Sequence, residues 1–196
     1  MKKLLTIICL LFQASYAYSQ NLPSDDQIEI FYDNGQLEYR GNQKDGKPDG
    51  LWEFFYDNGQ LKGRENYKDG KPEGFLDHFY DNGQLRSRKN HKDGALNGLS
   101  ESYYENSQLK YRGNYKNGEY DGPREAYYEN SQLKFKENHK DGVLDGLFES
   151  YYANGQLEKR GSFKDGKKEF VWVFFRESGN FIGANMYKDG ELVLVE

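Results

Sequence analysis

YDNGQL, at residues 32–37, sets the spacing of the whole sequence. It recurs at a constant interval as YDNGQL, YENSQL or YANGQL, beginning at Tyr56, Tyr80, Tyr104, Tyr128 and Tyr152. A second signal, Lys-Asp-Gly or Lys-Asn-Gly, keeps the same interval and places its glycine at Gly46, Gly70, Gly94, Gly118, Gly142, Gly166 and Gly190. Seven units of about 24 residues each therefore run from position 28 to position 196 without insertion or deletion.

Each unit contains two turn signals, one inside the hexapeptide and one at the Asp-Gly or Asn-Gly pair. Such pairs between apolar or aromatic runs indicate two-residue type I′ hairpins, whose central residues both need φ > 0. The runs between turns are too short for helices and are rich in residues that favour strands. The sequence therefore predicts an all-β protein: an elongated, single-layer antiparallel β-meander of seven two-strand repeats, with about fourteen strands.

Charged residues test the expected hairpin. If Asn34 and Gly35 form its tip, then Tyr32 faces Leu37 and Glu29 faces Arg40. The same offset pairs an acid with a base in the next five units: Glu53 with Arg64, Asp77 with Arg88, Glu101 with Arg112, Glu125 with Lys136, and Glu149 with Arg160. Facing opposite charges contribute about 0.2–1 kcal/mol each. We therefore expect these charges to stabilise the sheet rather than to serve as catalytic groups.

Two aromatic rows follow the repeat, and one of them is the candidate interaction surface. Phe31 and its equivalents hold one position, and a tyrosine holds the next. Because neighbouring residues of a strand face opposite sides, each side of the sheet is expected to carry one row. Tyrosine is favoured at protein interfaces, although a row can equally serve only to pack the sheet. The candidate residues are Tyr32, Tyr56, Tyr80, Tyr104, Tyr128 and Tyr152.

The segment 1–19 has the layout of a secretory signal peptide. Lys2 and Lys3 precede an apolar run at 4–12, which is shorter than the roughly 20 residues of a membrane span. Small residues then place cleavage near Ala17 or Ser19. We expect a signal peptide at 1–19, a polar lead at 20–27 and the repeat array at 28–196, whose atypical last unit caps it. The protein would be exported, and thus periplasmic or extracellular.

The sequence lacks the residue patterns that nucleic-acid binding, metal binding or catalysis would need. Cys9, in the apolar run, is the only cysteine, and loss of the signal peptide would take the formal net charge from −5 to −7. An acidic chain without a basic block does not suit nucleic acid. His91 and His139 occupy the column that holds Tyr67, Tyr115, Phe163 and Tyr187 in other units. They lie two units apart, which does not favour a shared metal ion. Serines such as Ser87 and Ser100 show no nucleophile pattern. We expect no enzyme activity, cofactor or metal.

The repeat resembles the MORN repeat, and most closely its bacterial variant. Residues 53–76, EFFYDNGQLKGRENYKDGKPEGFL, show the shared pattern of aromatic-Tyr-x-Asn-Gly-x-Leu followed by Tyr-Lys-Asp-Gly. The resemblance covers about 28–196. It implies a single twisted β-meander that serves as a scaffold and interaction surface. Some MORN proteins are linked to lipid contact, and members of the bacterial variant are often labelled antitoxin-like. The family implies no catalytic residue.

The resulting hypothesis is an exported, non-enzymatic scaffold that binds a protein through its sheet faces. Two alternatives remain: a binder of cell-envelope carbohydrate, and a periplasmic antitoxin-like or immunity-like protein. The acidic charge disfavours contact with anionic membranes, although the lysines of the Lys-Asp-Gly turns form a local basic row. The open edge strands also allow pairing with a second copy of the chain.

Overall fold

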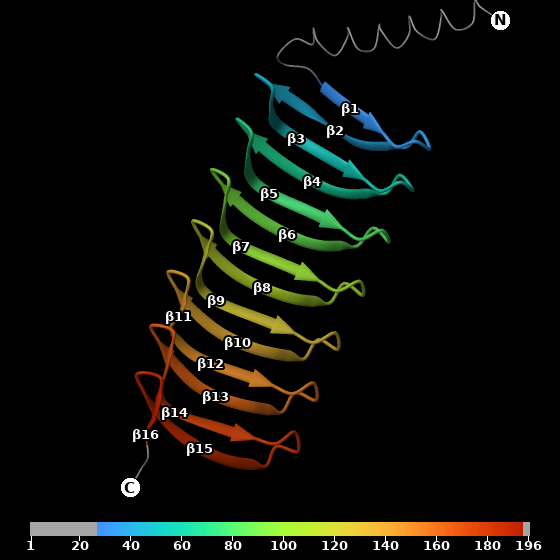
Figure 1. Ribbon diagram of the computed structural model, residues 1–196. Coiled ribbons are helices and arrows are strands. Elements are labelled where there is room, and N and C mark those ends of the chain that lie inside the picture. The colour runs from blue at the N-terminus through green and yellow to red at the C-terminus, as the bar shows by residue number, and fades with distance from the viewer. Residues whose placement is uncertain (1–26, 194–196) are drawn as a thin grey trace, which may run out of the picture.

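The computed structural model describes residues 27–193, which form one open, twisted antiparallel sheet (Figure 1). Its strands lie in chain order, so the all-β meander is confirmed. The strands are β1 (Gln27–Phe31), β2 (Leu37–Lys44), β3 (Lys47–Phe55), β4 (Leu61–Lys68), β5 (Lys71–Phe79), β6 (Leu85–Lys92), β7 (Ala95–Tyr103), β8 (Leu109–Lys116), β9 (Glu119–Tyr127), β10 (Leu133–Lys140), β11 (Val143–Leu144), β12 (Gly146–Tyr151), β13 (Leu157–Lys164), β14 (Lys167–Phe175), β15 (Phe181–Lys188) and β16 (Glu191–Val193).

The described part of the chain has 16 strands where about fourteen were expected. A break at Asp145 divides one strand into β11 and β12, and the segment 191–193 adds β16 after the last Lys-Asp-Gly turn. The predicted signal peptide lies outside the described residues. Within 27–193, no helix has the length and apolarity needed to cross a membrane.

The two turn signals build different hairpins. At the Asp-Gly pairs, both central residues have positive φ, for example 49° at Asp45 and 71° at Gly46, as a type I′ turn requires. In the hexapeptide only the third loop residue does so, with φ 84° at Gly35. The amide of Gly35 donates to the carbonyl of Tyr32 at 2.9 Å, and the Tyr32 amide donates to the carbonyl of Gln36 at 2.8 Å. The type I′ prediction was therefore wrong here: this is a three-residue loop ending in a left-handed glycine.

The wider loop shifts the local pairing by one position. Phe31, not Tyr32, lies opposite Leu37, and Tyr32 lies beyond the end of the strand. A bulge then restores the expected register, so Glu29 lies opposite Arg40 as predicted. The bulge compensates for the extra loop residue, and all six predicted acid–base pairs are confirmed as cross-strand neighbours.

These acids and bases occupy neighbouring cross-strand positions along one face of the sheet, which we call the ribbon face. Glu53 lies between two bases, 2.6 Å from Arg40 and 3.1 Å from Arg64. Glu125 likewise contacts Arg112 at 2.6 Å and Lys136 at 3.7 Å. Glu53 and Glu125 therefore each join the preceding unit to their own unit, in addition to the backbone ladder.

The opposite face, which we call the variable face, differs from unit to unit. Among the described residues, the buried hydrophobic side chains are those of Trp52, Leu76 and Trp172, all in one column of the repeat on this face. A single layer has no second sheet to pack against, so its core consists of side chains lying along the strands. Between Leu76 and Trp172, the same column holds Ser100, Arg124 and Phe148.

Candidate functional site

The six predicted tyrosines form a regular ladder at the strand ends. Each hydroxyl donates to a backbone carbonyl 23 residues later, at 2.7–3.0 Å, as Tyr32 does to Phe55 and Tyr80 to Tyr103. All six side chains are half-buried. Lysine ammonium groups cover three of the rings at 5.3–5.6 Å. The tyrosine ladder therefore joins consecutive units, and its role in partner binding stays a prediction.

The variable face begins with an aromatic cluster. Trp52 is 7% exposed and stacks on Tyr39 and Phe54, with ring centroids 5.9 and 6.4 Å away. Tyr67 approaches it edge-on at 6.4 Å. The indole fits because Gly41 lies beneath it: a Cβ at that glycine would be only 2.2 Å from the indole.

A second aromatic cluster lies toward the C-terminal end. Trp172 is 1% exposed, stacks on Phe148 at 5.7 Å and meets Phe163 edge-on at 5.0 Å. Lys168 lies 4.7 Å above the indole. Gly161 again makes the space, because a Cβ there would be 2.1 Å from Trp172.

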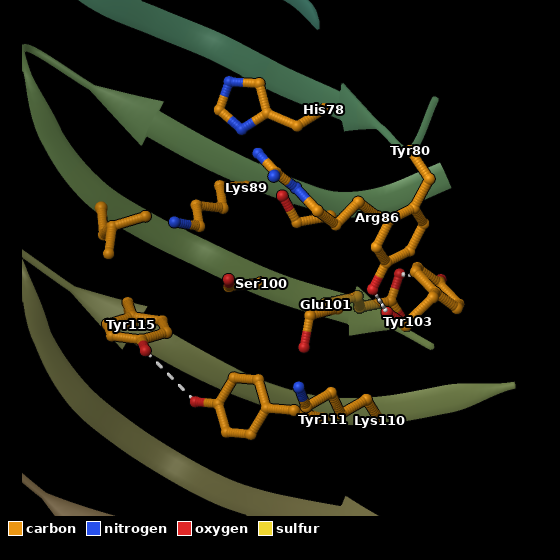
Figure 2. Close-up of a pocket in the computed structure, with 13 residues that line it drawn as sticks. His78, Tyr80, Arg86, Lys89, Ser100, Glu101, Tyr103, Lys110, Tyr111 and Tyr115 are labelled. Carbon is orange, nitrogen blue, oxygen red and sulfur yellow. Dashed lines mark hydrogen bonds between the residues drawn. The ribbon is translucent and has the colours of Figure 1, made fainter. Parts of the chain in front are cut away.

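Between the clusters the face is hollow, and the reason is a set of three substitutions. Two units after the first aromatic cluster, the positions of Tyr39, Trp52 and Phe54 hold small side chains. The replacing residues are Ser87, Ser100 and Ser102, respectively. They line a cavity of about 490 Å³ between β5 and β8, shown in Figure 2, which we call the serine hollow. Ser100 is 4% exposed, so it lies at the bottom of the hollow.

The wall of the serine hollow is cationic and aromatic. Arg86 and Lys89 come from β6 and Lys110 from β8, and Figure 2 shows them together with Ser100. The Tyr111 and Tyr115 hydroxyls lie 3.2 Å apart at one side. Burial raises the pKa of Tyr111 to about 12 and also raises the pKa of Tyr115, so both hydroxyls are neutral near pH 7.

A histidine–glutamate hydrogen bond lies on one side of the hollow and an arginine–glutamate ion pair lies on the other. His78 Nε2 lies 2.7 Å from Glu65 Oε1, and hydrogen bonds from His78 and Tyr67 hold the pKa of Glu65 below its usual range. On the other side, Arg124 pairs with Glu137, and its guanidinium lies 4.9–5.3 Å from three aromatic rings. Both of these acids therefore already have partners of their own.

The two histidines predicted to substitute for aromatic residues lie on this face. His139 is 7% exposed and packs 5.0 Å from Tyr120, and His91 is half-buried. Burial lowers the pKa of both imidazoles. Among residues 27–193, no three His, Cys, Asp or Glu side chains are grouped to hold a metal ion.

The comparisons with known proteins agree with the repeat. The sequence profile described as "MORN repeat variant" matches residues 28–45, 48–69, 78–93, 96–117, 120–141 and 144–165. The chain belongs to the MORN repeat variant family. No curated protein matches it.

The similar solved structures give no information about the function of this MORN protein. The crystal structure of TarM is 15% identical at a TM-score of 0.32, covering 68% of this chain and 24% of that one. The GtfA/B complex bound to UDP and GlcNAc is 14% identical at a TM-score of 0.24, covering 72% and 24%. This chain thus spans about a quarter of either protein, and the TM-scores are too low to support a shared fold or function.

Sequence reasoning missed the serine hollow of this MORN protein. The three serines show no nucleophile pattern, and the regularly spaced tyrosines were predicted to be the interaction surface instead. The sequence does contain a signal for it. Each of the three serines lies two repeat units after an aromatic residue of the first cluster, in the same column. Recognising it requires knowing that the three columns lie on one face, which depends on the register of both hairpins.

Proposed function

We propose that this MORN repeat variant protein is an exported, non-enzymatic scaffold that binds a partner protein through its variable face. The serine hollow carries the proposal. The tyrosine ladder and the ribbon of charges recur in each of the first six units, whereas the three serines of the hollow occur together in one place. A feature confined to one place distinguishes one segment of the array from the others, as specific recognition requires.

The ribbon face is less suited to this role because most of its charges already have partners. Four of its six acids are bound by bases of the same chain, for example Asp77 by Arg88 at 2.7 Å. Burying such pairs in an interface would desolvate them without new partners. On the variable face, by contrast, the hollow presents polar groups that a partner can reach.

Two features favour a protein partner over the alternatives. Trp52 and Trp172 are buried, so neither offers an open ring face for a sugar to stack on. His78 is bonded to Glu65, and within residues 27–193 no hydrogen bond joins its imidazole to a serine of the hollow, as an activated nucleophile would need. Export is supported only by the N-terminal sequence.

Photo-crosslinking in the native host tests the proposal. Benzoylphenylalanine at Leu96, which lines the hollow, should capture one defined protein outside the cytoplasm. The matched control is Leu99, on the same strand and 44% exposed on the ribbon face. Equal capture from both positions, or none from Leu96, would contradict binding through the variable face. Recovery of the protein only in the cytoplasm would contradict export.

A further inference from the structure

The serine hollow carries positive charge that the protein itself leaves unpaired. Seven ion pairs of Arg or Lys and two histidine–glutamate contacts join the described residues, and none includes Arg86, Lys89 or Lys110. The arginines of the ribbon face differ in this respect, since Arg40 and Arg88, for example, each contact an acid. Three cations that have no carboxylate partner among residues 27–193 therefore surround one cavity in a chain of net charge −5.

Acidic groups near the hollow do not cancel this charge. Glu65 and Glu137 are paired with His78 and Arg124. Glu101 also lines the cavity, and its carboxylate accepts the Tyr103 hydroxyl at 3.1 Å. One carboxylate in the lining thus stands against three cations, so the hollow attracts anions although the whole chain is acidic.

The floor and walls indicate which anion fits. Phosphate sites commonly use backbone amides at helix ends or in turns, whereas here the floor is made of strands whose amides belong to the sheet ladder. Stacking on a sugar needs open ring faces, but in the lining of the hollow Arg124 covers the Tyr111 ring at 5.3 Å. The available groups are side-chain cations and serine hydroxyls, which suit carboxylates.

The spacing of the cations points to more than one carboxylate. Arg86 and Lys110 lie two strands apart, or about 10 Å at the usual strand spacing, and Lys89 lies further along β6 than Arg86. On one side of an extended peptide, side chains recur at about 7 and 13 Å, which brackets this separation. The cavity is also lined from four strands, β5 to β8, which allows a chain to lie across it.

We propose that the serine hollow binds an extended, acidic segment of a partner protein, with its Asp or Glu carboxylates on Arg86, Lys89 and Lys110. The proposal rests on the scaffold function above and names the chemistry of the bound segment. The buried hydroxyls of Ser87 and Ser100 supply hydrogen bonds beneath the carboxylates.

Binding of a fluorescein-labelled octaglutamate peptide to the full chain, measured by anisotropy, tests the proposal. We expect binding that weakens as salt rises from 0.05 to 0.3 M, because exposed charges are screened over about 10 Å at 0.1 M. R86Q/K89Q/K110Q should weaken it about tenfold or more, which corresponds to about 1.4 kcal/mol shared among three exposed charge pairs. Octaglutamine should not bind.

Two further variants make the result specific to the hollow. K62Q/K134Q removes bases from the column of Arg86 and Lys110 in the units on either side, and it should weaken binding by less than about twofold. S100L fills the floor without changing charge. Leu76 occupies the same column one unit earlier. It lies opposite Glu65, as Ser100 lies opposite Lys89, so the fold accepts leucine in this column. S100L should weaken binding severalfold.

Three results would overturn the proposal: no binding of octaglutamate, equal losses in the hollow and control variants, or displacement by trigalacturonate or inorganic phosphate at lower concentration than by unlabelled octaglutamate. The scaffold function has its own outcome. If benzoylphenylalanine at Leu96 still captures its partner while octaglutamate does not bind, the acidic segment is wrong and the scaffold stands. Circular dichroism melts of every variant show whether a loss of binding is a loss of fold.

Discussion

A methyl group at Gly161 should disrupt the C-terminal aromatic cluster. A Cβ at this position would lie 2.1 Å from Cδ2 and 2.2 Å from Cε2 of Trp172, far inside van der Waals contact. The indole cannot swing away cheaply, because it is 1% exposed and is held between Phe148 and Phe163. Gly161→Ala therefore forces either the strand or the indole out of place.

The expected cost follows from this overlap. Overpacking a core typically costs about 1–3 kcal/mol, and a clash with a fully enclosed indole belongs at the upper end. For a domain of this size, about 3 kcal/mol corresponds to a fall of roughly 6–12 °C in the melting midpoint. Thermal unfolding followed by circular dichroism measures the fall. Tryptophan fluorescence in a W52F background reports whether Trp172 becomes exposed.

A double-mutant cycle isolates the clash. In a Trp172→Leu background, Gly161→Ala should cost less than about 0.5 kcal/mol, because the overlapping ring is gone. An earlier unit supports this expectation. There, Leu76 stands in the column of Trp172 and Glu65 stands in the column of Gly161, and the two residues lie opposite each other. Gly183→Ala is the control, as no atom lies within 4 Å of its Cβ position. Equal costs in the Trp172→Leu and unsubstituted backgrounds, or a cost no larger than at Gly183, would contradict a steric clash with the indole.

Three further predictions concern single positions. Phe170 has φ 63° and is 63% exposed, so Phe170→Gly should raise the midpoint by about 2 °C, as relief of left-handed strain outweighs the entropy of glycine; a lower midpoint would argue against this. Tyr104→Phe removes a 2.8 Å hydrogen bond to the Tyr127 carbonyl and should cost about 0.5–1.5 kcal/mol in thermal melts; an unchanged midpoint would show that the ladder contributes nothing there. Burial lowers the pKa of His139, so its stabilisation is present above the unfolded pKa of about 6.5 and is lost as pH falls through the folded pKa. His139→Phe should reduce the fall in midpoint between pH 7 and pH 5, and equal falls in both proteins would contradict this.

The regularity of the sequence predicted most of the fold. A fixed period with two turn signals leaves few arrangements other than a meander, and the acid–base pairs fix the register. The hexapeptide turn was mispredicted because Asn-Gly suits both a two-residue loop and a longer loop with a left-handed glycine. The pairing of Glu29 with Arg40 did not reveal the error, since the bulge cancels the extra residue. In the YENSQL loop, Ser107 stands in the place of the glycine and has a φ of 65°, which is the one left-handed conformation in that loop.

The candidate site was less predictable because it depends on side-chain volume. Period and charge are visible one column at a time, whereas the hollow requires three columns to become small in the same place. The tyrosines attracted attention through their regularity, but regularity in a repeat is first a sign of what every unit needs. Their hydroxyls bind the backbone of the following unit, which is such a need.

The hollow is compatible with stability because the array is stabilised by contacts between neighbours. In a repeat array, each unit depends on its own interactions and on those with adjacent units. The tyrosine ladder continues across the hollow, with Tyr80 and Tyr104 bonded to the units that follow. On the ribbon face, Arg88 and Asp77 remain paired in the same region. The serines therefore remove packing from one face only, while aromatic clusters support the sheet on both sides. In such a lattice a binding site can arise from a few small side chains, without any change in backbone, wherever the interactions common to all units are kept.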